Sequence, residues 1–115
     1  MSTIKVDTIK NTSNVEVFTA KAWVNFDGTG SPAIRASGNV TSITDEATGV
    51  YTVNFTNAMP DTDYAVSFGA KENVNGANLF GRLSSGMNTT DLRTVFADES
   101  GTASDGHTCN VIVFR

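Results

Sequence analysis

The fold is decided by the segment GVYTVNFTNAMPDTDYAVSF, residues 49–68, which holds two runs of alternating apolar and polar residues. The apolar positions are Tyr51, Val53 and Phe55 in the first run and Tyr64, Val66 and Phe68 in the second. Strict alternation places these side chains on one face of an extended strand. A group of turn-forming residues, 59–63, separates the runs. The segment therefore predicts two strands, each with one buried face.

The same alternation recurs along most of the chain. Further strands are predicted at residues 22–26, 33–36, 40–43, 79–83, 92–96 and 109–114. Residues 45–49 form a predicted turn, and the pair Asn75-Gly76 between two strand-like runs predicts a hairpin. No helical periodicity lasts beyond one turn. We therefore expect an all-β fold, an antiparallel β-sandwich or a jelly-roll or barrel-like domain of about eight or nine short strands.

Composition favours the same fold class and excludes several functions. The 115 residues include 16 Thr, 11 Asn, 10 Ser and 10 Gly but only four Lys, a mixture that suits strands and turns. The net charge is −4 and no Lys/Arg cluster occurs, which argues against nucleic acid and against anionic membranes as partners. One cysteine and one histidine cannot build a structural zinc site. We expect no metal and no cofactor, no secretory signal and no membrane-spanning segment.

The N-terminal residues differ from the rest of the chain. Ile4, Val6 and Ile9 mark a short extended segment, and the polar residues 11–14 separate it from the next strand. We expect residues 1–20 to form an arm and residues 21–115 to form a single β-rich domain. The arm would pair with another subunit or dock on a partner; the alternative is an edge strand of the same sheet.

Residues 28–33, Gly-Thr-Gly-Ser-Pro-Ala, match the loose dinucleotide pattern G-x-G-x-x-A. A phosphate-binding loop of that kind opens a helix within a βαβ unit. Here a short β-like run follows, and the preceding Asp27-Gly28 pair is a turn signal. We interpret the loop as a connection between two strands.

Two other groups of residues are candidates for chemistry. Asp98, Glu99, Asp105 and His107 lie within ten residues, but their spacing fits no EF-hand and predicts a solvated loop. His107 and Cys109 would share one face of a strand. However, Cys109 begins the apolar face of the last strand, which predicts a buried, inert thiol rather than a nucleophile. No catalytic residues are expected.

Trp23 lies on the polar side of its predicted strand, opposite the alternating Ala22, Val24 and Phe26. A tryptophan at such a position is typical of a subunit interface. Packing within the chain and a platform for a sugar ring are the alternatives. We predict an interface for Trp23, together with Ile4, Val6 and Ile9 of the arm.

Four stretches in order resemble a β-rich module of tail-fibre and related virion proteins of marine tailed bacteriophages, cyanophages especially. They are residues 21–28 (KAWVNFDG), 34–45 (IRASGNVTSITD), 49–60 (GVYTVNFTNAMP) and 64–66 (YAV), and the opening MSTIKVDTIKNTS is similar as well. The resemblance implies a non-enzymatic virion component, trimeric as such fibres usually are. The chain is shorter than these fibres, which leaves open a short fibre or fibre tip, a head decoration and a tail accessory.

The sequence therefore predicts a phage virion structural protein, made in the host cytoplasm, which self-assembles and contacts other virion proteins. The first alternative is a module that binds a host-surface glycan through the loops at 70–78 and 98–107. The second, less favoured, is a polysaccharide hydrolase. It needs two carboxylates facing one cleft, and no such pair could be placed among Asp61, Asp63, Asp91, Asp98, Glu99 and Asp105.

Overall fold

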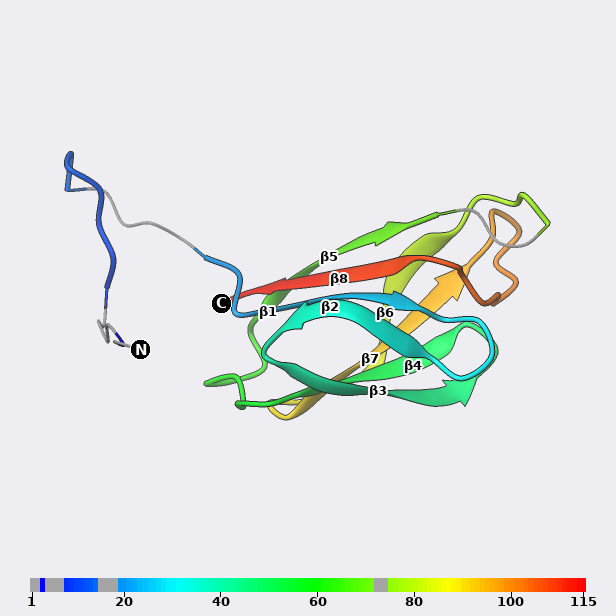
Figure 1. The fold of residues 1–115 in the computed structure, drawn as a ribbon, viewed down its shortest axis with the longest axis horizontal. Helices are drawn as coiled ribbons and strands as arrows, with labels where there is room; N and C mark the ends of the chain where they lie inside the picture. Colours follow the sequence, from blue (N-terminus) through cyan, green and yellow to red (C-terminus); the bar gives the residue numbers. More distant parts are fainter. Residues whose placement is uncertain (1–2, 4–7, 15–18, 72–74) are drawn as a thin grey trace.

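The chain folds as a β-sandwich of two four-stranded antiparallel sheets (Figure 1). The computed structural model describes residues 3, 8–14, 19–71 and 75–115. The strands are β1 (Ala22–Asp27), β2 (Ala33–Gly38), β3 (Val40–Ala47), β4 (Val50–Phe55), β5 (Ala65–Ala70), β6 (Phe80–Met87), β7 (Asp91–Ala97) and β8 (Cys109–Phe114). The described residues contain no helix. The all-β prediction and the expected number of strands are confirmed.

Two separate sheets favour the sandwich over a closed barrel. Sheet I has the strand order β2-β1-β8-β5, and sheet II has the order β3-β4-β7-β6. Every pairing within them is antiparallel. The chain changes sheet between β2 and β3, between β4 and β5, between β5 and β6, and between β7 and β8. The two sheets are therefore built from strands taken from both halves of the sequence.

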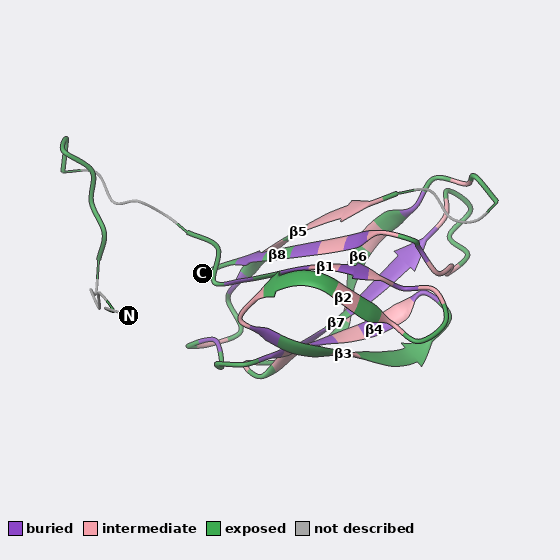
Figure 2. Cartoon of the chain, viewed as in Figure 1, coloured by how far each residue is buried: buried purple, intermediate pink, exposed green. Residues whose placement is uncertain are grey.

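The core lies between the sheets and consists of the alternating apolar side chains that the sequence marks (Figure 2). Tyr51 and Val53 are at most 1% exposed, and the rings of Phe26 and Tyr51 pack edge to face with centroids 5.1 Å apart. Phe26 makes a second edge contact with Phe96 at 6.3 Å. Aromatic pairs prefer this geometry, because the positive ring edge meets the negative ring face. The aromatic cluster therefore joins β1 of sheet I to β4 and β7 of sheet II.

The hairpin predicted at Asn75-Gly76 is wrong. β5 and β6 lie in different sheets, so the connection between them crosses the edge of the sandwich instead of folding one strand back on its neighbour. Gly76 has a φ of 79°, as a turn glycine does. An Asn-Gly pair indicates a local turn of the backbone and does not show that the two flanking strands pair with each other. The partners of β5 and β6 are β8 and β7, which lie far away in sequence.

The turn predicted at residues 45–49 is shorter than expected. β3 continues to Ala47, which leaves Thr48 and Gly49 as the turn before β4. Gly49 has a φ of 70°, and a Cβ on it would lie 2.5 Å from the Ser104 backbone nitrogen and 2.6 Å from the Phe96 carbonyl oxygen. Only glycine fits here, because both the backbone conformation and the space exclude a side chain.

No described residue before Ala22 belongs to a strand of either sheet. Residues 8–14 are exposed, and Ile9 retains 51% of its surface. Ile4 and Val6 lie outside the described residues. The backbone N–H of Lys21 donates to the Val113 carbonyl at 2.7 Å, so the N-terminal segment leaves the sandwich beside the end of β8. The role of residues 1–20 as an arm stays a prediction.

Candidate functional site

Three large apolar side chains lie together on the outer face of sheet I. Trp23 on β1 is directly opposite Ile112 on β8, and Phe114 lies two residues further along β8 on the same face. Their exposed fractions are 41%, 38% and 42%. Directly opposite pairs on one sheet face have Cβ atoms about 5 Å apart. Trp23, Ile112 and Phe114 therefore form a continuous strip, called the outer stripe below.

Small residues flank the outer stripe. Gly38 is paired with Trp23, Ser67 with Ile112, and Ala65 with Phe114. A Cβ on Gly38 would lie 2.3 Å from Nε1 of the indole, so the Trp23 ring lies across the bare backbone of β2. Small residues thus border the outer stripe, and Arg35, which bonds to Asn25 on the same face, lies further along β2. The outward position of Trp23 agrees with the alternation of its strand; its place in an interface stays a prediction.

On the outer face of sheet II, the part formed by β3 and β4 is polar, and its side chains bond to one another. Nδ2 of Asn54 donates to Ser42 Oγ at 3.1 Å and to Thr44 Oγ1 at 2.9 Å. The Thr52 hydroxyl donates to Glu46 Oε1 at 2.8 Å. These five side chains, on β3 and β4, are called the polar ladder below.

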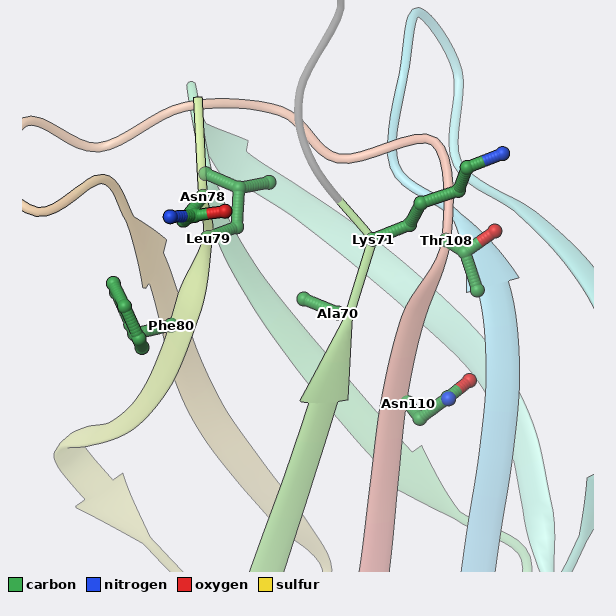
Figure 3. A pocket seen from close by; sticks show the side chains of 7 residues that line it. All are labelled: Ala70, Lys71, Asn78, Leu79, Phe80, Thr108 and Asn110. Atoms are coloured by element: carbon green, nitrogen blue, oxygen red, sulfur yellow. The ribbon is translucent and has the colours of Figure 1, made fainter. Parts of the chain in front are cut away.

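A second candidate site is a pocket of about 610 Å³ at one end of the sandwich (Figure 3). It forms where β5 ends and where β6 and β8 begin. We call it the edge pocket; the described residues that line it are Ala70, Lys71, Asn78, Leu79, Phe80, Thr108 and Asn110. Leu79 is 7% exposed, whereas Phe80 is 58% exposed. None of these lining residues is acidic, although the chain has a net charge of −4.

Asn110 gives the edge pocket a buried polar atom. Its Oδ1 is buried without a hydrogen-bond partner among the described residues. Asn110 is paired with Gly69 on β5, and a Cβ on Gly69 would lie 3.2 Å from Asn110 Nδ2. The absence of a side chain at Gly69 therefore makes room for the amide. An unpaired buried carbonyl oxygen costs free energy until a donor reaches it.

Hydrogen bonds hold the rim of the edge pocket. The backbone N–H of Lys71 donates to the Thr108 carbonyl at 3.0 Å and ties the end of β5 to the start of β8. Arg35 on β2 donates from Nη2 to the His107 carbonyl at 2.6 Å and from Nη1 to the Thr108 hydroxyl at 3.3 Å. Because Thr108 accepts from Arg35, its own hydroxyl proton stays available to the pocket.

The acidic residues of the loop before β8 stabilise that loop. Oδ1 of Asp98 accepts hydrogen bonds from the Ser100 hydroxyl at 2.7 Å and from the Ser100 and Thr102 backbone at 3.0 Å. The Ser100 hydroxyl, followed by the Thr102 N–H, lowers the pKa of Asp98. Asp105 Oδ1 accepts from the Gly49 backbone at 2.8 Å. In the part of the chain that the structure describes, no three His, Cys, Asp or Glu side chains gather in a way that could hold a metal ion.

Tyr51 joins this loop to the turn after β1. Its hydroxyl lies 2.8 Å from Asp105 Oδ1 and 2.8 Å from the Gly28 carbonyl oxygen. Burial, followed by the hydrogen bond to Asp105, raises the pKa of Tyr51. The hydroxyl is therefore a neutral donor that connects sheet II to a turn of sheet I.

Cys109 is buried, as the sequence predicted. It is 0% exposed, and its thiol donates to the Gly106 carbonyl at 3.8 Å. Burial raises the pKa of Cys109 to about 12, so the thiol is protonated at neutral pH and is a poor nucleophile. His107 is exposed.

The glycine-rich segment is a connection between strands, as interpreted. Residues 28–32 join β1 to β2, and a strand follows where a phosphate-binding loop would open a helix. Asp27 Oδ1 accepts hydrogen bonds from the Thr29 hydroxyl at 2.6 Å and from the Thr29 N–H at 2.9 Å. These bonds lower the pKa of Asp27 and are typical of a side chain that closes a turn.

Two more of the carboxylates considered for hydrolysis, Asp61 and Asp91, are held by other side chains. Asp61 pairs with Arg115 through two bonds of 2.6 and 2.7 Å. Asp91 accepts from the Asn88 amide at 2.8 Å and from the Thr90 hydroxyl at 3.0 Å. Sequence reasoning missed one juxtaposition: Asp45, Glu46 and Asp105 line a hollow of about 190 Å³. Only the packing of the β3–β4 turn against the loop before β8 brings these three together.

The described residues include no helix that is long and apolar enough to cross a membrane.

Comparison with known proteins finds a similar fold but no related sequence. No protein-family model matches the chain, and no curated protein sequence matches it. A solved structure with a similar fold is the tailspike of phage phiAB6, determined in complex with three-repeated oligosaccharides of Acinetobacter baumannii surface polysaccharide. The TM-score is 0.57 at 15% sequence identity, and the match covers 98% of this chain. It spans 29% of the tailspike chain, so the sandwich corresponds to one region of a longer protein.

Proposed function

We propose that this protein is a structural module of a tailed-phage virion, which self-associates through the outer stripe of sheet I. The observation that carries the proposal is the outer stripe itself: Trp23, Ile112 and Phe114 are exposed side by side and are bordered by Gly38, Ser67 and Ala65. Exposed apolar patches of this kind mark contact sites, and tryptophan is enriched among residues that dominate binding energy.

Two likenesses support the virion part of the proposal. The sandwich has the fold of a region of a phage tailspike. The sequence resembles a module of virion proteins of marine tailed phages at residues 21–66 and at its opening. We propose a trimer, located on the tail or as a head or tail accessory, with no catalytic role of its own.

Residues 1–20 are the proposed attachment arm. The segment leaves the domain next to the outer stripe, since Lys21 bonds to Val113 and Phe114 follows Val113 on β8. Ile9 is exposed and available for contact, and Ile4 and Val6 complete the apolar set of the arm. An arm that crosses to a neighbouring subunit or to another virion protein would remove its own apolar side chains and the outer stripe from water.

The mass of the purified chain in solution, from size-exclusion chromatography with light scattering at several concentrations, tests the proposal. We expect a mass near three times the 12.2 kDa of one chain. Removal of residues 1–14 should lower the oligomer's stability or release it from its virion partner. A monomer at every concentration contradicts self-association, and an unchanged assembly after the deletion contradicts the arm.

The edge pocket favours a second function, binding of a glycan on the host surface. The tailspike with the similar fold was solved with oligosaccharides of a bacterial surface polysaccharide. The lining residues Ala70, Lys71 and Asn78 belong to the loop 70–78, which the sequence offers for this function. A glycan array probed with the oligomer tests this second function, since a pure scaffold binds no glycan selectively.

A further inference from the structure

β5 is an outermost strand of sheet I and has a neighbour on one side only. It pairs with β8, and no strand among the described residues lies along its other edge (Figure 1). The N–H of Lys71 donates to the carbonyl of Thr108, which continues the β5–β8 register. In an antiparallel pair every second residue back from Lys71 then also faces β8. The N–H and C=O groups of Val66, Phe68 and Ala70 therefore point away from β8, toward the open edge.

The other three outermost strands carry features that discourage pairing. β2 has Arg35 at a register shift, and β3 has Asp45 and Glu46 together with two register shifts. β6 has Arg82 and one register shift. Charged side chains and bulges are the devices by which natural sheets block their edges. β5, with the sequence AVSFGA, has no charge, no proline and no register shift, so it is the edge that an additional strand fits best.

The core is incompletely covered along this edge. Val66 and Phe68 on β5 pack against the core but stay partly exposed. On β6, Leu83 is paired with the fully buried Thr94, which places it on the core face, yet 40% of its surface is exposed. A Cβ on Gly81 would lie 2.6 Å from the Phe68 side chain, so β6 lies against β5 here. Apolar side chains laid along this boundary, called the open rim below, would gain by burial.

The N-terminal segment has the pattern that such a strand needs. In residues 3–8, TIKVDT, Ile4 and Val6 alternate with two charged residues. As a strand, the segment would turn one apolar face toward the open rim and one charged face toward water. Segments that extend a sheet gain affinity from main-chain hydrogen bonds and specificity from alternate side chains. The described arm residues 8–14 are exposed and belong to neither sheet of their own chain.

We propose that residues 3–8 of one subunit add as a strand to the free edge of β5 in a neighbouring subunit, with Ile4 and Val6 over the open rim. β5 adjoins the outer stripe, since Ser67 is paired with Ile112, so the added strand extends the proposed contact of sheet I. A donor arm and an acceptor edge are different surfaces, which makes the contact head-to-tail, the type from which a trimeric ring is built. The inference rests on the proposed self-association and arm, and it names the surface that receives the arm.

Amide hydrogen exchange of the ¹⁵N-labelled full chain, at a concentration where light scattering shows the oligomer, tests the acceptor edge. The Val66 and Phe68 amides should exchange at least about tenfold more slowly than in a chain without residues 1–9. The Ser67 and Gly69 amides face β8 and should exchange at the same rate in both chains. Fast exchange of the edge amides in the oligomer overturns the inference and leaves self-association through the outer stripe intact. Absence of any oligomer overturns both.

A mixing experiment identifies the donor of the strand. A ¹⁵N-labelled chain without residues 1–9 lacks the donor segment, so addition of the unlabelled full chain should restore slow exchange of its Val66 and Phe68 amides. Slow exchange in the truncated chain alone would mean that the edge is covered without the arm, as in a β5–β5 dimer. Slow exchange confined to the full chain would mean that each arm covers its own β5. Either of these two results overturns the inference.

Matched variants of the unlabelled donor test the two faces of the added strand. Ile4→Ser/Val6→Ser removes the apolar face and should abolish the protection that the donor gives to the truncated chain. Lys5→Ser/Asp7→Ser removes the charged face and should keep that protection within about twofold. Both pairs precede β1, and unchanged amide shifts of the eight strands confirm that each variant is folded. Equal effects of the two variants overturn the assignment of Ile4 and Val6 to the open rim.

Discussion

The two outer faces of this sandwich differ although both face away from the core. Sheet I carries the outer stripe of Trp23, Ile112 and Phe114, bordered by glycine, alanine and serine. On sheet II, Asn54 and Thr52 belong to the polar ladder, whose side chains bond to one another. The outer stripe thus gains by being covered and the polar ladder does not; the exposed Phe80 lies at the other edge of sheet II, on β6.

The physical reason lies in what each face loses or gains when it leaves water. The polar ladder would exchange satisfied hydrogen bonds and water contacts for a dry surface, with little or no net gain. The outer stripe would remove apolar surface from water, which yields roughly 25 cal/mol per Å². The proposed subunit contact therefore lies on sheet I, and the polar ladder of sheet II stays in contact with water.

The largest expected effect comes from removing the outer stripe. The double variant Trp23→Ser/Ile112→Ser should weaken self-association by about thirtyfold or more, because the loss of even one hot-spot side chain costs about 2 kcal/mol or more. The matched variant Thr44→Ser/Thr52→Ser changes the polar ladder and should leave association within about twofold. Sedimentation equilibrium at several concentrations measures both. If the sheet II variant dissociates and the sheet I variant still associates like the parent chain, the contact lies on sheet II.

A second prediction concerns the link between the two sheets. The Tyr51 hydroxyl joins β4 to the Gly28 carbonyl after β1 and to Asp105. Tyr51→Phe removes the donor that the buried Gly28 carbonyl and the partly buried Asp105 share, although Asp105 keeps its bond from the Gly49 N–H, and should lower the free energy of unfolding by about 1–3 kcal/mol. Association of the folded chains should not change, because no atom of either outer face is removed.

Urea unfolding at a concentration where the chain is monomeric measures this effect. Tyr64→Phe is the control, since that hydroxyl donates to the Asn88 carbonyl at 2.8 Å in a partly buried position. The control should cost less than Tyr51→Phe. Equal losses of unfolding free energy would mean that the hydroxyl between the two sheets stabilises the fold no more than the Tyr64 hydroxyl does.

A third, smaller effect isolates the orientation of the indole. In Gly38→Ala the new methyl group would meet Trp23 Nε1 at 2.3 Å, so the ring must tilt away from β2. We expect association to weaken about tenfold at most, with the fold intact. Gly86→Ala is the match on sheet II, where the methyl group would lie 3.1 Å from Arg93 Cβ. Calorimetric dilution of the two variants compares them, and similar heats for both would show that the pose of Trp23 does not matter.

Most of the fold could be predicted from the sequence, because each strand carries its own signal. Alternation marked Tyr51, Val53 and Phe55 as inward-facing, and all three are buried. Pairing could not be predicted in the same way. The β5–β8 and β6–β7 contacts join strands that no local turn connects, and the Asn75-Gly76 signal pointed to a hairpin that the fold does not contain.

The candidate sites were only partly predictable. Trp23 stood out because it interrupts the polar side of its strand. Ile112 and Phe114 carried the same signal, since the last strand is apolar on both faces, but only the pairing of β1 with β8 shows that they adjoin Trp23. The edge pocket is lined by residues 70, 71 and 78 of one loop proposed for glycan contact, and by Thr108 and Asn110 in place of residues 98–107 of the other.

The smallest expected effect is on stability at acid pH, and it comes from the ion pair at the end of the outer stripe. Arg115 follows Phe114 and forms two bonds to Asp61. These bonds lower the pKa of Asp61 from 3.8 to about 2. Since the folded-state pKa is the lower one, the pair stabilises the fold fully above pH 3.8 and loses this contribution as the pH falls through about 2. Both side chains are exposed, so screening keeps the contribution small.

In Asp61→Asn the free energy of unfolding should therefore depend less on pH between about pH 4 and pH 2. Near neutral pH, its dependence on pH should be the same as in the parent chain. Asp63→Asn, on the same loop, is the control and should keep the acid dependence of the parent chain. Thermal unfolding over this pH range measures both variants. The Arg115–Asp61 pair holds the end of β8, which carries Phe114. If this anchoring positions Phe114 for the contact, Asp61→Asn should also weaken association slightly at neutral pH. Unchanged association would show that Trp23 and Ile112 carry the contact without the end of the strand.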